Sequence, residues 1–328
     1  MFLAALILIL SGLPVAFILG GCALAFGGIG IPAEFIAPIQ MTNIVPRIFG
    51  SVISNNVLVA VPLFIFMGTL LNKTEIAGDL LESLGWVLRK VPGGQAVAVV
   101  VLGTIMAATT GIVGASVVML SLMAIPVLRD ANYSMPLTYG VVAASGTLGI
   151  LIPPSIMLVI LGNQIQVPVG ALFAGALFPG LFLSFTYIVY VIALALIKPS
   201  VAPRIERANE VDDVHIKRRL FLGLVPPALL IFSVLGSILL GFATPTEAAG
   251  VGVVGAIVLG LLYRKLDRAI FSSSIDQTAV TNALVFFIFF GATAFAYVFR
   301  ILDGEYFVVD LLNHINIDIV QEVVIFVM

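Results

Sequence analysis

Long apolar runs, separated by short polar or glycine- and proline-rich stretches, dominate this chain. Most runs reach about 20 residues, the length at which an α-helix crosses the roughly 30 Å hydrocarbon core of a bilayer. The alternation of apolar and polar residues that is typical of membrane β-barrel strands is missing. The pattern therefore predicts an all-α polytopic membrane protein. Its expected spans are residues 1–28, 53–71, 136–165, 168–197, 220–241, 245–263 and 278–299.

One more apolar segment, residues 93–129, has basic residues at both flanks and the polar centre TTGIVGAS. Each arm is roughly 16 to 18 residues long, which fits either a re-entrant hairpin or two short spans. The stretch before it, residues 75–90, is amphipathic, with Leu84 and Val87 on its apolar face. It is predicted to be a helix that lies along the membrane surface.

Composition and charge agree with a membrane protein. The chain is 61% hydrophobic and 10% charged, with a mean hydropathy of +1.22, which a water-soluble surface cannot accommodate. The net charge of −2 and the scattered basic residues indicate no nucleic-acid surface. Basic residues gather in residues 198–219 and around Arg264 and Lys265, so both segments are predicted to be cytoplasmic.

Two sequence patterns occur twice, in the same order. FIFMGT (64–69) recurs as FIFFGA (287–292), and LPVAFILGG around Pro14 resembles TPTEAAGVG around Pro245. Five predicted crossings separate the two copies, and an odd number inverts the second copy, as in many secondary transporters. At this spacing the second copies of the hairpin and of the central proline pair would fall beyond Met328. The second repeat is therefore expected to be incomplete.

The stretch GTLGILIPPS, residues 146–155, lies at the centre of the predicted span 136–165. Pro153 and Pro154 have no N–H, so the carbonyls of Gly149 and Ile150 lose their helical partners, and a break in the helix is expected. A dehydrated cation would compensate the unpaired carbonyls at membrane depth. The alternative is a proline kink whose carbonyls are paired by neighbouring helices or water. The candidate cation ligands are Ser145, Gly146, Thr147, Gly149, Ile150 and Thr110.

The polar centre of residues 93–129 offers a second set of candidates. Threonine, serine and glycine facing a broken helix would form an ion and substrate site, but the same small residues also suit a helix-packing surface. The residues alone leave both possibilities open. The candidate substrate-binding residues are Thr109, Thr110, Gly111, Ser116 and Ser155.

Five segments carry a family resemblance. GLPVAFILG, GASVV, ASGTLGILIPPS, LFAGALFPGL and ATPTEAAGVG, in this order, resemble the large membrane subunit (DctM type) of tripartite ATP-independent periplasmic (TRAP) transporters over essentially the whole chain. The resemblance implies a Na⁺-driven, elevator-type importer of organic acids in a bacterial inner membrane. It also implies two partners, a small four-span subunit (DctQ type) and a periplasmic substrate-binding protein (DctP type).

The resemblance further implies that sodium and substrate lie between hairpin tips and broken helices, here residues 109–116 and 146–155. Family hairpins often read Ser-Gly-Ser-Ser, whereas this chain has Thr110-Gly111-Ile112-Val113, which lacks two of those hydroxyls. The expected organisation has four parts. Residues 1–92 hold scaffold spans and the surface helix, 93–197 the transport-domain half, 198–219 a cytoplasmic loop, and 220–328 the start of the inverted second repeat.

Three alternatives remain beside this interpretation: a stand-alone transporter, an intramembrane enzyme and a purely structural membrane subunit. A stand-alone ion-coupled carboxylate transporter of related fold would work without a binding protein. An intramembrane enzyme would need a Gly-x-Ser-Gly motif with a membrane histidine, paired intramembrane aspartates or His/Glu metal spacing, and the sequence contains none of these. The sequence therefore predicts a transporter subunit and not an enzyme.

Overall fold

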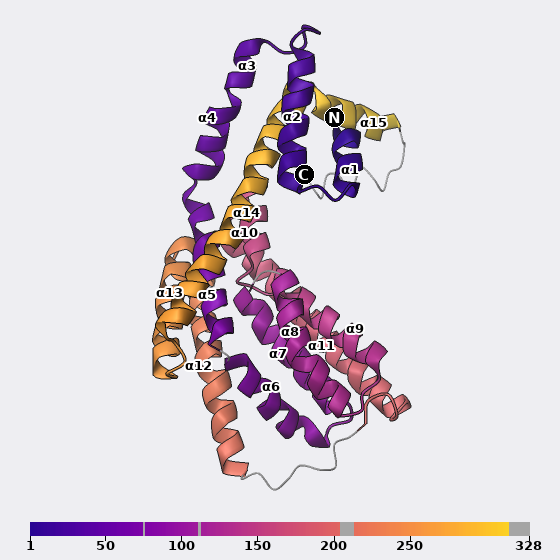
Figure 1. The fold of residues 1–328 in the computed structure, drawn as a ribbon, viewed down its shortest axis with the longest axis vertical. Coiled ribbons are helices and arrows are strands. Elements are labelled where there is room, and N and C mark those ends of the chain that lie inside the picture. Colours follow the sequence, from indigo (N-terminus) through magenta and orange to yellow (C-terminus); the bar gives the residue numbers. More distant parts are fainter. Residues whose placement is uncertain (75, 111–112, 204–212, 315–328) are drawn as a thin grey trace. The chain divides into compact units, whose positions relative to one another are not determined.

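The computed structural model is helical throughout the residues that it describes, which are 1–74, 76–110, 113–203 and 213–314 (Figure 1). The all-α prediction is confirmed. The chain divides into two compact units, Met1–Asn56 with Val280–Met328, and Val57–Ala279. Within the described ranges, four helical segments are long and apolar enough to cross a membrane. These are Asn56–Lys73, Val169–Ile197, Pro245–Leu262 and Arg268–Ile301.

In the first unit, the region predicted as one span over 1–28 forms two helices. Its elements are α1 (Phe2–Leu10), α2 (Val15–Gly30), α3 (Pro38–Thr42), α4 (Ile44–Ile48), the π-helical turn η1 (Phe49–Ile53), the C-terminal part of α14 (Arg268–Ile301) and α15 (Gly304–His314). The prediction of a single span over 1–28 is wrong. Gly12 has φ +81°, a left-handed conformation that favours glycine, and the Pro14 ring cannot continue a helix.

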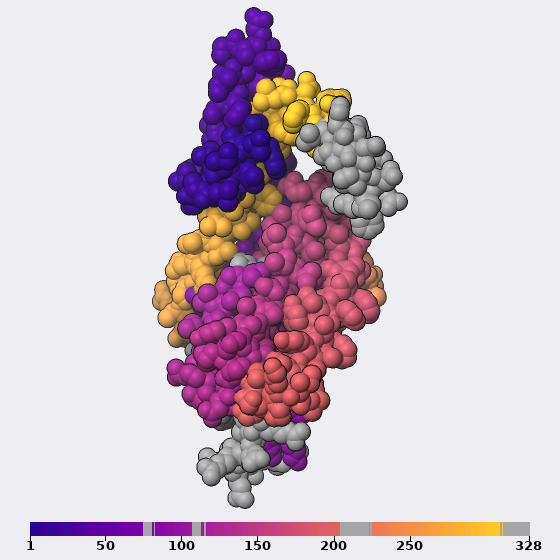
Figure 2. Space-filling model, turned by 90° about the vertical axis from the view of Figure 1, so that its right-hand side faces the viewer, coloured from indigo at the N-terminus to yellow at the C-terminus, as the bar shows by residue number. Residues whose placement is uncertain are grey.

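The second unit contains the predicted hairpin and the predicted broken helix. Its elements are the 3₁₀ turn η2 (Asn56–Val59), α5 (Ala60–Lys73), α6 (Ile76–Val87), the 3₁₀ turn η3 (Leu88–Lys90), α7 (Gly94–Thr110), α8 (Val113–Asp130), α9 (Met135–Thr147), the 3₁₀ turn η4 (Leu148–Ile150), α10 (Ile156–Gln164), α11 (Val169–Ile197), α12 (Asp213–Leu239), α13 (Pro245–Leu262) and the start of α14. Figure 2 shows this unit from the side, where α8, α9 and α11, coloured magenta to pink, form one face.

Helix α7 is the centre of the second unit. Val97, Ala98, Val99 and Val100 are consecutive and so point to all sides of the helix, yet none is more than 5% exposed. A helix that is apolar all round needs neighbours all round, and α5, α6, α8, α9 and α11 supply them. The hairpin arm α7 is therefore surrounded by protein.

Helix α6 corresponds to the helix predicted over residues 75–90. It packs on α7 and α12, and Leu81 and Leu84 join the core. Of the two residues predicted on the apolar face, Leu84 is buried and Val87 is 44% exposed. The α-helix ends at Val87 and tightens into η3, where the guanidinium carbon of Arg89 lies 4.1 Å from the ring centroid of Trp86. Its place along a membrane surface stays a prediction.

Two other boundaries differ from the predicted spans. Helix α12 begins at Asp213, inside the segment 198–219 that was predicted as a loop. Residues 204–212 of that segment lie outside the described residues. Helix α14 begins at Arg268, before the predicted start at 278, because Asp267 Oδ1 accepts a hydrogen bond from the Ile270 amide at 2.6 Å and caps the helix there.

The repeated sequence patterns form two reciprocal helix pairs. FIFMGT lies in α5, which packs on α13, the helix that starts at Pro245. FIFFGA lies in α14, where Phe287 contacts Phe17 of α2, with ring centroids 5.0 Å apart. The second helix of each copy thus packs on the first helix of the other. The inversion of the second copy stays a prediction. The division into scaffold and transport parts concerns motion and stays a prediction.

We expect Thr244→Ala to lower the free energy of unfolding by about 1 kcal/mol, because it removes the N-cap of α13. Thr244 Oγ1 accepts from the Glu247 amide at 3.3 Å, and Glu247 Oε2 accepts from the Thr244 amide at 2.8 Å. Thermal unfolding in detergent measures the change. Thr186→Ala, which removes an exposed hydroxyl within α11, is the control, and an equal loss in both variants would contradict the capping role.

Candidate functional site

The candidate site begins at a break between two half-helices, α9 and α10. Helix α9 ends at Thr147, η4 adds one tight turn, and α10 starts only at Ile156. The Leu148 carbonyl accepts from the amides of Leu151 at 3.0 Å and Ile152 at 2.9 Å. The next two residues are the prolines, which have no amide to continue the series.

One of the two carbonyls predicted to be free has a partner. Ser155 Oγ donates to the Ile150 carbonyl at 2.8 Å, and Ser155 is fully buried. Ser155 is also the N-cap residue of α10, yet its side chain makes no capping hydrogen bond there. The hydroxyl hydrogen of Ser155 therefore pairs a carbonyl at the end of the first half-helix. The side chain of Ser155 does not cap the first amides of α10.

Apolar side chains and one glycine pack around the break. Leu148 is fully buried and Ile152 is 4% exposed, and both pack with Ile231 of α12. A Cβ added at Gly180 of α11 would lie 2.9 Å from Cγ1 of Ile152, so glycine lets α11 pack closely against the break. Gly180 lies in the segment LFAGALFPGL, but nothing in the sequence indicates this contact.

Both arms of the hairpin lie against the first half of the broken helix. A Cβ added at Gly146 would lie 3.0 Å from the Cα and 3.1 Å from the amide nitrogen of Val117 in α8. A Cβ added at Gly103 of α7 would lie 3.2 Å from the Ser145 carbonyl oxygen. The backbones of α7, α8 and α9 thus meet at small residues, and Ser116, which is 2% exposed, lies beside this contact.

The predicted hydroxyl ligands differ in their surroundings. Ser145 is fully buried, and its Oγ has no hydrogen-bond partner among the residues that the structure describes. Thr147 is exposed, and its Oγ1 donates to the Ala144 carbonyl at 2.8 Å. Thr109 and Thr110 end α7. Gly111 lies outside the described residues.

The break presents two helix ends of opposite polarity. The C-terminal carbonyls of α9 carry partial negative charge and attract cations, whereas the N-terminal amides of α10 carry partial positive charge and attract anions. Ser145 lies four residues before Gly149, hence on the same side of a helix. The arrangement can place a cation at the end of α9 and an anion at the start of α10.

The base of the hairpin is fixed by a buried tyrosine. The Tyr133 hydroxyl accepts a hydrogen bond from the Gln95 amide at 3.3 Å, which ties the start of α7 to the turn between α8 and α9. Burial raises the pKa of Tyr133 above its usual value. The residue therefore stays neutral at physiological pH.

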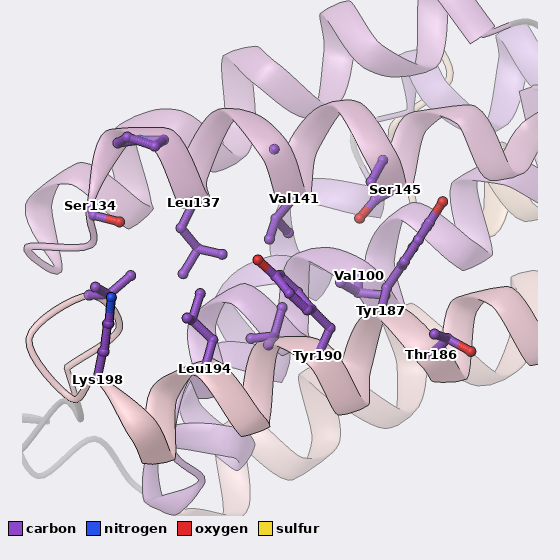
Figure 3. Close-up of a pocket in the computed structure, with 15 residues that line it drawn as sticks. Val100, Ser134, Leu137, Val141, Ser145, Thr186, Tyr187, Tyr190, Leu194 and Lys198 are labelled. Carbon is purple, nitrogen blue, oxygen red and sulfur yellow. The ribbon is translucent and has the colours of Figure 1, made fainter.

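A cavity of about 750 Å³ lies between α7, α9 and α11 (Figure 3). Ser145 lines one end of it, and Ser134 and Lys198 line the other. Beside it, Thr104 Oγ1 and Ser184 Oγ share a 2.6 Å hydrogen bond between α7 and α11. Sequence patterns did not predict this cavity, because its walls come from three helices that are distant in sequence.

This chain is similar in sequence to known proteins. The family model "Tripartite ATP-independent periplasmic transporter, DctM component" matches residues 2–328. A C4-dicarboxylate TRAP transporter large permease protein of Pseudomonas aeruginosa is 31% identical over 74% of this chain and 55% of its own length. A sialic acid TRAP transporter large permease protein of Vibrio cholerae is 28% identical over 89% of this chain and 65% of its own length.

A third relative, the isethionate TRAP transporter permease protein DctMQ of Oleidesulfovibrio alaskensis, is 28% identical over 88% of this chain and 44% of its own length. The chain thus spans about half the length of the curated relatives that it matches. All three relatives are named as transporter permeases and not as enzymes. The family match extends over nearly every residue and includes both the hairpin and the broken helix, so this chain belongs to the DctM family of TRAP transporter membrane components.

Proposed function

We propose that this chain acts as the large permease subunit of a Na⁺-coupled, binding-protein-dependent importer of organic acids in a bacterial inner membrane. Its partners would be a DctQ-type small subunit and a DctP-type periplasmic binding protein. The names of the relatives support an acidic substrate, since C4-dicarboxylates, sialic acid and isethionate all carry an acid group. The name DctMQ supports a partner of the DctQ type.

The observation that carries this proposal is the packing of the broken helix on the hairpin at Gly146 and Val117. Unwound carbonyls and half-helix C-termini bind Na⁺ in secondary transporters, while half-helix N-termini bind anionic substrate groups. The donor set at α9 fits a sodium ion, because it consists of neutral oxygens from the Gly149 carbonyl and nearby hydroxyls. Thr147 donates its hydrogen to a backbone carbonyl and keeps oxygen lone pairs for a cation.

The same contact explains how ion and substrate would be coupled. Sodium at the end of α9 would hold the break and the hairpin in one arrangement, in which the substrate carboxylate meets the start of α10 and the region of Ser116. The anion then binds well only when the ion is present. Each Na⁺ that moves inward gains about 2.3 kcal/mol per 100 mV of membrane potential. Movement of the hairpin and broken helix against a scaffold would then carry both inward.

Uptake into proteoliposomes tests the proposal. The complete transporter, with its small subunit and binding protein, would be offered labelled C4-dicarboxylate, sialic acid and isethionate. We expect uptake of at least one of them only with an inward Na⁺ gradient and with the binding protein. Uptake without the binding protein would favour the stand-alone carboxylate transporter. Uptake that is unchanged when K⁺ replaces Na⁺ would contradict sodium coupling.

Ser145→Ala separates a role as ion ligand from a structural role. Because the Ser145 hydroxyl is buried without a partner, its removal should leave the unfolding temperature unchanged or slightly raised. The Na⁺ concentration for half-maximal uptake should rise roughly tenfold. A polar group that interacts with a charged partner contributes about 1.5 kcal/mol to the free energy of binding. Ser233→Ala, which removes an exposed hydroxyl of α12, is the control. Unchanged Na⁺ dependence in Ser145→Ala would show that Ser145 is not a ligand of the ion.

A further inference from the structure

The cavity between α7, α9 and α11 has a charged end at Lys198, an apolar middle and hydroxyl groups at the end near Ser145. Figure 3 shows Lys198 and Ser134 together at one end, with the ammonium group of Lys198 directed towards Ser134. Leu137, Val141 and Leu194 line the middle. Water needs two to four polar partners to be held in such a space, and aliphatic walls supply none. The lining therefore suits an amphiphilic ligand with a hydrocarbon tail.

The length of the cavity matches one leaflet of a bilayer. Its two ends are marked by Ser134, the residue before α9, and Ser145, which follows eleven positions later in that helix. At about 1.5 Å per residue this is roughly 16 Å, close to half of the roughly 30 Å hydrocarbon core. A single acyl chain that enters beside Ser134 would therefore end near the middle of the membrane.

The charge at the polar end indicates the kind of head group. Lys198 follows the last residue of α11 and has no ion-pair partner among the residues that the structure describes. It opens the basic segment 198–219, which the distribution of lysine and arginine assigns to the cytoplasmic side. Anionic phospholipids in that leaflet attract lysine side chains near the surface. Tyr190, which also lines the cavity, has the amphipathic ring that favours this interfacial depth.

We propose that this cavity binds one anionic phospholipid of the cytoplasmic leaflet, with an acyl chain along α9 and α11 and its phosphate beside Lys198. The lipid fills the space between α11 and the first half of the broken helix, and so supports the packing around Ser145. This site goes beyond the proposed function, since it depends on neither sodium nor an organic acid.

Photo-crosslinking tests the site directly. The purified chain is placed in nanodiscs of phosphatidylethanolamine that contain a minor fraction of phosphatidylglycerol with a diazirine near the end of one acyl chain. After irradiation, peptide mass spectrometry locates the label. We expect it to concentrate on the lining residues of α7, α9 and α11 around Ser145, and to fall when unlabelled phosphatidylglycerol, but not phosphatidylcholine, is added in excess.

Two variants with matched controls make the test specific. A Cβ added at Gly140, which lines the cavity, meets no atom within 4 Å, so Gly140→Phe fills the space without a backbone clash. It should reduce labelling around Ser145 to background. Gly175→Phe, at an equally open glycine of α11 outside the cavity lining, should not.

The second variant tests the charge at the mouth of the cavity. Lys198→Gln should lower the preference for phosphatidylglycerol over phosphatidylcholine about fivefold, the factor that one lysine supplies near an anionic surface. Lys90→Gln, an equal change of charge at an exposed position outside the cavity lining, should leave the preference unchanged.

Three results would overturn the proposal. Labelling spread evenly over the exposed faces of the helices would indicate bulk lipid only. Labelling that is absent from the cavity but present elsewhere on α11 would show that another protein segment or water fills the space. Equal competition by phosphatidylcholine and phosphatidylglycerol would exclude recognition of an anionic head group.

Discussion

Pro153→Ala with Pro154→Ala is expected to abolish Na⁺-dependent uptake while the protein keeps its thermal stability. The two new amides can donate to the carbonyls of Gly149 and Ile150, so α9 can continue through the break. A proline costs about 3 kcal/mol in a helix interior relative to alanine, which favours the continuous helix. The Gly149 carbonyl, which is proposed to bind the cation, would then be paired within the helix. Uptake by proteoliposomes and the Na⁺-induced shift of the unfolding temperature measure the loss.

The chain offers a matched control for this double variant. Pro226 and Pro227 are also adjacent, but they lie inside α12, which continues through them. Pro226→Ala with Pro227→Ala should therefore leave the Na⁺ response intact. The single variant Pro154→Ala, which restores only the amide facing Ile150, should give an intermediate loss. Wild-type Na⁺-dependent uptake in the Pro153/Pro154 double variant would contradict the role assigned to the break.

Gly146→Ala is expected to lower the free energy of unfolding by about 1–3 kcal/mol and to impair transport strongly. The added methyl group would lie 3.0 Å from the Val117 Cα, and backbone cannot move aside as a flexible side chain can. Helices α8 and α9 would have to separate at the point where the hairpin meets the broken helix. Thermal unfolding and Na⁺-dependent uptake, measured on the same preparation, report the two effects.

Gly140→Ala is the control for this substitution, because it makes the same change in the same helix. A Cβ at Gly140 meets nothing within 4 Å, and alanine is favoured over glycine in a helix by up to about 1 kcal/mol. Gly140→Ala should therefore unfold at the same or a higher temperature and transport normally. If the two variants lost equal stability, the loss would come from placing alanine in this helix and not from the contact with Val117.

Several features could be predicted because their causes are local in the sequence. The apolar run over residues 168–197 corresponds to α11, and the run over 245–263 to α13, since length and composition decide whether a helix can cross a bilayer. The break after Gly149 was expected from the missing amides of Pro153 and Pro154. The structure agrees there, since α9 and α10 are separate helices.

Other features could not be predicted, because they depend on which helices meet. Ser155 was predicted as a substrate-binding residue from its place in the sequence, but the hydrogen bond from its hydroxyl to the Ile150 carbonyl depends on how the break folds. Helical period placed Leu84 and Val87 on one apolar face, but it could not predict that neighbouring helices bury Leu84 and leave Val87 exposed. The close contacts at Gly103 and Gly180 were missed, since isolated glycines in apolar helices carry no sign of the partner that they will meet.

The two proline pairs show that local chemistry alone does not predict where a helix breaks. Both remove two amides from an apolar helix, yet α12 continues through Pro226 and Pro227 whereas the helix breaks before Pro153 and Pro154. Membrane character, the helical class and the family pattern follow from the sequence alone, because they depend on composition and on short motifs. Which proline pair opens the backbone, and which cavity lies beside it, was decided by tertiary packing. At the open pair, the leucine and isoleucine side chains of the break are buried against α11 and α12, and glycines allow α8 and α11 to approach its backbone.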